Sequence, residues 1–204
     1  MKNIKAIIFD FGGVLFDIDF PRLNNAFSKL GVQHFEEKYS QKKASPLFQS
    51  LEEGKVSPEE FYIQFCKESK SNLSNEQIQL AWNSILVAFR REALESLRKI
   101  RSKYKLYLLS NTNKIHLQAF NKIYNEQIGK GSLEDYFDKA YYSHEINCRK
   151  PGKEPYELVL KENNLIAAET LFIDDSVQNI EPARKLGIKT ILLKPGMGIE
   201  DLGL

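Results

Sequence analysis

The sequence has 204 residues and a mass of 23.5 kDa, the size of one ordinary domain or of a domain with a modest insertion. An apolar fraction of 42%, which includes 13 Phe, is enough for a large hydrophobic core and excludes global disorder. Lys and Arg number 29 against 27 Asp and Glu, so the formal net charge is only +2 and no basic block marks a nucleic-acid-binding surface.

The sequence also excludes several other classes of protein. No apolar run approaches the ~20 residues that a membrane-spanning helix requires. The first residues, Met1–Phe9, are briefly similar to a signal peptide, but Asp10 interrupts the apolar stretch and no small-residue cleavage site follows closely. Cys66 and Cys148 are too few for a disulfide framework or a zinc site. We therefore expect a cytoplasmic protein with neither a nucleic-acid nor a membrane partner.

Short apolar segments recur along the chain and alternate with helical patterns. The segments predicted as strands are Ile4–Phe9, Lys105–Leu109, Lys139–Tyr142, Thr170–Ile173 and Thr190–Leu193. The segments predicted as helices of the same domain are Arg91–Ile100, Asn113–Tyr124, Glu154–Glu162 and Val177–Leu186, the last ending before Gly187. Nearly continuous apolar strands are typical of a sheet covered on both faces. The alternation predicts an α/β fold with a doubly wound, Rossmann-type parallel sheet.

The long stretch between the first two predicted strands exceeds what one crossover helix requires. Leu23, Phe27 and Leu30 repeat at helical spacing, and the segments 57–60 and 74–77 are capping boxes that begin further helices. We predict a small all-helical cap domain over residues 18–87, inserted into a core domain of residues 1–17 and 88–204. The insertion leaves the carboxyl end of the first strand, where open parallel sheets bind ligands, so it is placed to act as a lid.

Polar side chains follow three of the predicted strands at the points where those strands end. They are Asp10, the pair Ser110 and Asn111, and the pair Asp174 and Asp175. Because the carboxyl ends of parallel strands meet at one edge of the sheet, these groups are expected to converge. Carboxylates a few ångströms apart repel one another, and Mg²⁺ would relieve that repulsion, since it prefers a few carboxylates with phosphate oxygens and water. The sequence therefore predicts a magnesium site at this edge.

A phosphate site is predicted beside that cation. Ser110 and Asn111 offer a hydroxyl and an amide, and the backbone N–H groups of the following helix start favour an anion. Lys150 lies before another predicted helix and can neutralise further negative charge. Together, the carboxylates, the cation and the phosphate donors indicate phosphoryl transfer with an aspartate nucleophile.

These segments resemble the four motifs of the haloacid dehalogenase (HAD) superfamily, in the same order along nearly the whole chain. The matching segments are Phe9–Val14, Leu109–Thr112, Arg149–Pro151 and Phe172–Ser176, the last followed by Asn179, Ile180, Ala183 and Leu186–Ile188. The insertion is similar to the small helical cap of the first HAD subclass. The segments Phe16–Phe20 and Ser110–Asn113 are especially similar to bacterial sugar-phosphate phosphatases of the glucose-1-phosphate phosphatase group, and also to the phosphatase half of epoxide hydrolases.

The resemblance implies a hydrolase, a magnesium-dependent phosphatase that acts on a small phosphate ester, with a sugar phosphate favoured. It implies that Asp10 is the nucleophile that forms an aspartyl-phosphate. The implied magnesium ligands are Asp10, Asp175 and the carbonyl of Gly12, with Asp174 as a further ligand or an outer carboxylate. The implied phosphate-binding residues are Ser110, Asn111 and Lys150, of which Lys150 also assists catalysis.

One position departs from the pattern of this family. Phosphatases of the family usually carry a second aspartate two residues after the nucleophile, where this sequence has Gly12. A general acid–base contributes roughly 10²–10⁴-fold to rate. Three interpretations remain: a phosphatase that uses water or another carboxylate, a 2-haloacid dehalogenase, or a catalytically weak phosphate-binding protein. We place the phosphatase first, because dehalogenation needs no metal and the pair Asp174 and Asp175 is present, and because the similar sugar phosphatases also lack this aspartate.

Asp17 and Asp19 are the carboxylates that could replace the missing acid. The simpler interpretation is that they cap the helix that begins near Phe20. The functional interpretation places one of them at the junction between cap and core, facing the substrate. His116 and His144 are expected to be surface or packing residues.

Overall fold

The computed structural model describes residues 3–41 and 43–204. Its centre is a parallel five-stranded sheet in the order β7-β6-β1-β8-β9. The strands are β1 (Ala6–Phe9), β6 (Lys105–Ser110), β7 (Lys139–Tyr142), β8 (Thr170–Asp174) and β9 (Lys189–Leu192). In register, Phe9 of β1 lies between Leu108 of β6 and Ile173 of β8. The residues that follow these strands are therefore brought to one edge of the sheet.

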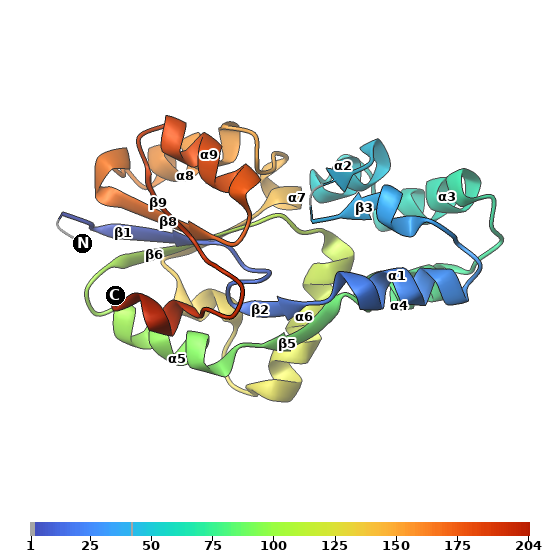
Figure 1. The fold of residues 1–204 in the computed structure, drawn as a ribbon, viewed down its shortest axis with the longest axis horizontal. Coiled ribbons are helices and arrows are strands. Elements are labelled where there is room, and N and C mark those ends of the chain that lie inside the picture. Colours follow the sequence, from blue (N-terminus) through green and yellow to red (C-terminus); the bar gives the residue numbers. More distant parts are fainter. Residues whose placement is uncertain (1–2, 42) are drawn as a thin grey trace.

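Helices cover both faces of this sheet (Figure 1). On one face lie α8 (Glu154–Glu162) and α9 (Val177–Lys185), and on the other lie α5 (Arg91–Ile100) and α6 (Lys114–Gln127). Successive strand residues alternate between the two hydrophobic layers: Ile8 packs with the α8 and α9 side, whereas Ile7 and Phe9 pack with the α5 and α6 side. The short helix α7 (Ser143–Ile146) follows β7, and 3-10 turns lie at Leu133–Tyr136, Ala167–Glu169 and Ile199–Leu202. This arrangement confirms the predicted doubly wound α/β fold.

The insertion extends beyond the carboxyl edge of the sheet. It contains α1 (Phe20–Lys29), a 3-10 turn at Phe35–Glu37, α2 (Pro46–Glu52), α3 (Pro58–Ser69) and α4 (Asn75–Asn83). Both predicted capping boxes are present, at Ser57 and Ser74. Aromatic rings fill its interior, where Phe27 stacks on Phe35 at 4.0 Å between ring centroids. The division of the chain into a cap of residues 18–87 and a core stays a prediction.

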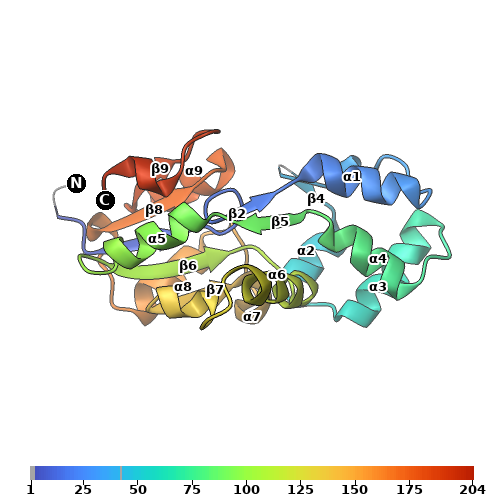
Figure 2. The same ribbon diagram turned by 90° about the horizontal axis from the view of Figure 1, so that it is seen from below.

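Two pairs of short strands were not predicted. β2 (Phe16–Ile18) and β5 (Leu86–Phe89) pair in antiparallel fashion and connect the insertion to the rest of the molecule (Figure 2). β3 (Tyr39–Ser40) and β4 (Lys43–Ala44) form a small hairpin, so the insertion is predominantly rather than entirely helical. β2, β3 and β4 have only two or three residues, which is too short to show a periodic apolar pattern.

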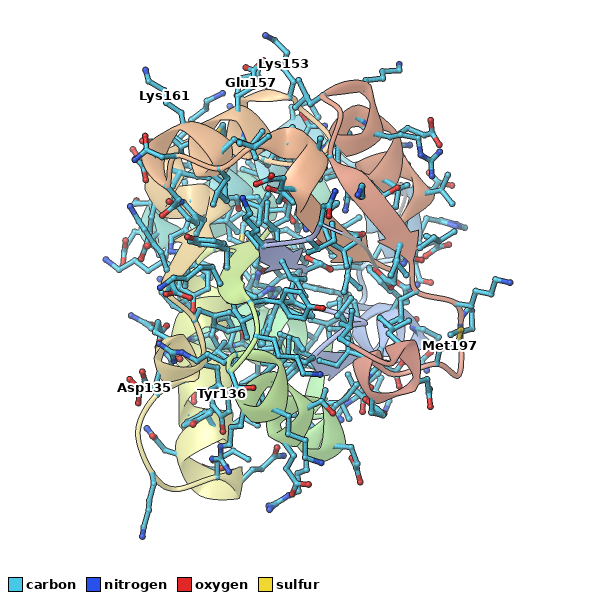
Figure 3. The ribbon with its side chains drawn as sticks, turned by 90° about the vertical axis from the view of Figure 1, so that its left-hand side faces the viewer. Asp135, Tyr136, Lys153, Glu157, Lys161 and Met197 are labelled. Carbon is cyan, nitrogen blue, oxygen red and sulfur yellow. The ribbon has the colours of Figure 1, made fainter. Side chains whose placement is uncertain are left out.

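The other predicted elements agree with the structure to within a few residues at their ends. The predicted strand Ile4–Phe9 begins at Ala6, and the predicted strand Thr190–Leu193 is shifted by one residue to Lys189–Leu192. Among the helices of the described residues, none is long and apolar enough to cross a lipid bilayer. Viewed from the end opposite the insertion, Lys153 at the N-cap of α8 and Glu157 and Lys161 on α8 project outward (Figure 3).

Candidate active site

The three predicted carboxylates meet at the carboxyl edge of the sheet. Asp10 follows β1, Asp174 ends β8, and Asp175 follows it. Each offers a carboxylate oxygen, and these oxygens lie within 4.8 Å of one another. Burial, reinforced by Asp174 and Asp175 and opposed by Lys150, raises the pKa of Asp10 to about 7. Burial and the charge of Asp174 raise the pKa of Asp175 to about 6. Such mutual repulsion favours a bound cation.

Lys150 supplies positive charge within the same cluster. Its side chain is 1% exposed, and its Nζ donates to Oδ1 of Asp10 at 2.6 Å, to Oδ2 of Asp174 at 2.8 Å and to the carbonyl oxygen of Leu109 at 2.8 Å. Burial alone lowers the pKa of Lys150, but the attraction of Asp10 and Asp174 outweighs burial and raises this pKa above its ordinary value. Lys150 is therefore a charged group that directly orients the Asp10 carboxylate.

The environments of Asp174 and Asp175 are different. Asp174 is fully buried, and both of its oxygens already accept hydrogen bonds, from Lys150, from the backbone N–H of Ser176 and from the amide of Asn179. Asp175 instead lines a cavity, where its Oδ2 accepts from Nε2 of Gln41 at 3.0 Å. This difference favours Asp175 as a direct cation ligand and Asp174 as the residue that holds Lys150 in place.

Asn111 fixes the loop that carries Lys150. Its Nδ2 donates to the carbonyl oxygen of Lys150 at 2.8 Å, and its Oδ1 accepts from the backbone N–H of Lys150 at 2.9 Å. Asn111 also lines the cavity beside Asp10. Ser110 is buried at the end of β6 and is not among the described residues that line this cavity. Direct phosphate contacts by Ser110 and Asn111 stay predictions.

The glycines after Asp10 shape the floor of the site. Gly12 lines the cavity, and it is not among the residues with positive φ. A Cβ at this position would lie 3.3 Å from Cδ1 of Ile18, a flexible side-chain end. Gly13 has a φ of +78°, and a Cβ there would overlap Oδ2 of Asp175. The chain therefore requires glycine at position 13, whereas at position 12 a side chain could be accommodated only if the Ile18 side chain shifts.

Asp17 and Asp19 have other partners. Asp19 is the N-cap of α1, where its Oδ1 accepts from the backbone N–H of Arg22 at 2.8 Å, as the simpler interpretation predicted. Asp17 does not cap this helix; its Oδ1 accepts from Nε of Arg90 at 2.6 Å, and Arg90 also donates to the carbonyl of Gly13 at 2.7 Å. Neither carboxylate is among the described residues that line the cavity beside Asp10.

The cavity beside Asp10 has a volume of about 440 Å³ and is lined by residues of both the sheet edge and the insertion. Its lining includes three residues to which the sequence analysis gave no role of their own: Tyr39, Glu52 and Arg149. The Glu52 carboxylate joins the other two, accepting from the Tyr39 hydroxyl at 2.8 Å and from Nε of Arg149 at 2.7 Å. The only sequence signal for this group is the position of Arg149 directly before Lys150.

The site fits a hard divalent cation. Two partly accessible carboxylates, Asp10 and Asp175, face one cavity, and a third carboxylate lies behind them. The carbonyl of Gly12 belongs to the same lining segment and can complete a set of oxygen ligands, which is the donor type that Mg²⁺ prefers. Lys150 provides positive charge on one side of Asp10, so the pocket suits a dianionic phosphate group.

Comparison with known proteins gives one consistent result. Residues 4–187 match the family model described as haloacid dehalogenase-like hydrolase. The chain is 36% identical over 188 residues to a D-ribitol-5-phosphate phosphatase from Bacteroides thetaiotaomicron, and this alignment covers 92% of this chain and 90% of that protein. It is 29% identical over 191 residues to a sesquiterpene phosphatase from Aspergillus oryzae, covering 91% and 88% of the two chains.

A solved structure agrees closely with this fold. The crystal structure of an aspartate-to-alanine mutant of a HAD family enzyme from Bacteroides thetaiotaomicron, in complex with magnesium and inorganic phosphate, matches with a TM-score of 0.91. It is 37% identical, and the match covers 98% of this chain and 99% of that one. The match over nearly the whole length confirms the resemblance inferred from the motifs. The chain belongs to the haloacid dehalogenase-like hydrolase family, and it is an enzyme of the phosphatase type within that family.

Proposed function

We propose that the protein is a magnesium-dependent phosphatase that hydrolyses a small phosphorylated polyol or sugar through an aspartyl-phosphate on Asp10. The observation that carries this proposal is the convergence of Asp10, Asp175 and Lys150 on one cavity at the carboxyl edge of the sheet. The 36% identity to a D-ribitol-5-phosphate phosphatase supports a polyol or sugar as the leaving group. We also expect the enzyme to act in the cytoplasm.

The magnesium ion is proposed to be held by Asp10, Asp175 and the carbonyl of Gly12, with Asp174 behind them. When bound, it supplies positive charge that offsets the repulsion among the carboxylates and the negative charge of the phosphate. Asp174 acts on the site through Lys150, whose Nζ lies between the two carboxylates of Asp10 and Asp174. The carboxylates at positions 174 and 175 do not favour the dehalogenase alternative, since dehalogenation needs no metal.

In the proposed reaction an oxygen of Asp10 attacks phosphorus, and the bond between phosphorus and the leaving-group oxygen breaks. Lys150 donates a hydrogen bond to Oδ1 of Asp10, which leaves the other oxygen for the attack. The leaving oxygen takes a proton as it departs. A water then attacks phosphorus of the aspartyl-phosphate, which releases inorganic phosphate and restores the Asp10 carboxylate. Because Asp17 and Asp19 are bonded elsewhere, we assign the leaving-group proton to water.

The test combines chelation with a substitution at the nucleophile. Excess chelator is expected to abolish hydrolysis of p-nitrophenyl phosphate, and added magnesium is expected to restore it. Asp10→Asn preserves shape but removes the anionic nucleophile, so activity should fall to background while the melting curve shows a folded protein. Turnover of Asp10→Asn near the wild-type rate, or full activity on a haloacid with none on any phosphate ester, would contradict the proposal.

A further inference from the structure

Three residues from distant segments form a polar cluster in the wall of the active-site cavity. Tyr39 belongs to β3, Glu52 ends α2, and Arg149 precedes Lys150 in the sheet-edge loop. Oε1 of Glu52 accepts from the Tyr39 hydroxyl, and Oε2 accepts from Nε of Arg149. We call these residues the Tyr39–Glu52–Arg149 cluster. It joins the insertion to the loop that carries the phosphate-site lysine.

Cap docking alone does not explain why this cluster is polar. The Glu52 side chain is only 3% exposed, and burial raises its pKa, although the charge of Arg149 and the hydrogen bond from Tyr39 oppose that shift. Well-packed apolar residues often replace a buried ion pair at no cost in stability. Elsewhere the insertion packs on the core through stacked rings: the ring centroids of Trp82 and His116 lie 4.4 Å apart. The polar cluster therefore suggests a ligand.

The cluster presents both donors and an acceptor to the cavity. Arg149 uses Nε for Glu52, and in residues 3–41 and 43–204 no acceptor takes a hydrogen bond from its two terminal nitrogens. The Tyr39 hydroxyl gives its proton to Glu52, so its oxygen lone pairs remain as acceptors. Both residues line the cavity that contains Asp10. A hydroxyl group needs this combination, because it donates one hydrogen bond and accepts others.

We propose that the Tyr39–Glu52–Arg149 cluster is the subsite for a polyhydroxylated leaving group. Tyr39 and Arg149 contact the hydroxyls, and Glu52 is a positioning residue that fixes both of them. The inference rests on the proposed function for the phosphate end of the substrate. A terpenoid or simple alkyl chain would cover the half-buried Tyr39 oxygen and the terminal nitrogens of Arg149 without pairing them, which disfavours its binding. The cavity volume of about 440 Å³ lies within the ~300–1,000 Å³ usual for small-molecule sites.

The test measures binding by calorimetry, so that it does not depend on turnover. Full-length protein carrying Asp10→Asn is titrated in magnesium buffer with D-ribitol 5-phosphate and with pentyl phosphate, which has the same chain length without hydroxyls. Adding Tyr39→Phe or Arg149→Lys is expected to weaken ribitol 5-phosphate binding about tenfold, which corresponds to one good hydrogen bond, and to change pentyl phosphate binding less than about twofold. Glu52→Gln should act in the same direction.

Tyr62→Phe is the matched control, because Tyr62 lies on α3 of the insertion and is not among the described residues of this cavity. It should leave both affinities unchanged. Equal weakening of both ligands would mean that the cluster is merely structural. That result, unchanged affinity in the cluster variants, or no preference for ribitol 5-phosphate in the parent protein would overturn the inference. Failure of the wild-type chain to hydrolyse any phosphate ester would overturn the proposed function instead, and the binding result would still decide the role of the cluster.

Discussion

The floor and the wall of the active-site cavity are built in contrasting ways. The floor consists of Asp10, Asp174, Asp175 and Lys150, which lie at the ends of strands or in the adjoining loop and bond closely to one another. The wall is the Tyr39–Glu52–Arg149 cluster, in which a buried carboxylate from the insertion reaches a loop of the core.

This contrast indicates that the floor and the wall have different roles in substrate binding. Under the proposals above, the floor would bind the phosphate group that all substrates of a phosphatase share, and the wall would contact the leaving group that distinguishes them. Changes in the floor should therefore affect all phosphate esters alike, and changes in the wall should discriminate among them. Kinetic measurements on variants of each part can show whether the floor and the wall act separately.

The largest effect is expected for Lys150→Met. This substitution removes the charge that lies between Asp10 and Asp174. We expect kcat to fall by roughly 10³-fold or more on aryl, alkyl and polyol phosphates alike, since all present the same phosphate to the floor. Steady-state kinetics on the three esters, with a melting curve for each protein, make the comparison.

Lys153→Met is the matched control for this prediction. Lys153 lies three residues further along, bonds Glu157 at the surface and points away from the molecule (Figure 3). It should retain wild-type kinetics. A loss in Lys150→Met that depended strongly on the leaving group would show that floor and wall are not separate.

A smaller effect concerns how the insertion docks on the core. His116 of α6 is buried and stacks on Trp82 of α4. Nε2 of His116 forms a hydrogen bond with the backbone carbonyl of Trp82 at 3.2 Å. Burial lowers the pKa of His116 from 6.5 to about 4, so the unfolded chain binds a proton at a pH where the folded chain does not. The contribution of His116 to the free energy of unfolding is therefore fully present above pH 6.5. It is lost as the pH falls towards 4, and the loss is at most ~3 kcal/mol.

His116→Gln should remove this contribution to the pH dependence. Urea denaturation at pH 7 and pH 4.5 measures the free energy of unfolding of both proteins. We expect wild type to lose more stability between the two pH values than His116→Gln does. His34→Gln, at an exposed position, should behave like wild type. Equal losses in wild type and His116→Gln would contradict the assignment of a neutral, buried His116.

The smallest effect is expected at Gly12, which lines the cavity two residues after Asp10. Gly12→Asp would restore an acid two residues after the nucleophile, and the new Cβ would lie 3.3 Å from Cδ1 of Ile18, so the Ile18 side chain must shift to admit it. We expect kcat to rise about tenfold more for an alkyl phosphate than for an aryl phosphate, because a poor leaving group needs more protonation. Gly12→Asn has the same shape without the acid and should show no such gain. No gain on the alkyl ester in a folded, magnesium-bound Gly12→Asp protein would indicate that the missing acid is already supplied elsewhere.

The sequence predicted the floor more completely than the wall, and chain geometry explains why. Asp10, Asp174 and Asp175 each adjoin a buried strand, and a parallel sheet brings such strand ends together whatever the insertion does. Glu52 gives no comparable signal, since it lies at the end of an amphipathic helix where a charged residue normally faces solvent. Its burial depends on how α2 docks on the loop of Arg149, which no local pattern specifies. The same limit applies to the unpredicted ion pair of Asp17 with Arg90.

The contact between Trp82 and His116 has a practical consequence. Trp82 is the single tryptophan of the chain, it is fully buried, and it belongs to the insertion while its stacking partner belongs to the core. A buried indole fluoresces at shorter wavelength than a hydrated one. If the insertion lifts away from α6, the emission of the unlabelled protein should shift to the red. The emission wavelength of Trp82 can therefore be used to follow the position of the insertion in a stopped-flow instrument, without any added dye.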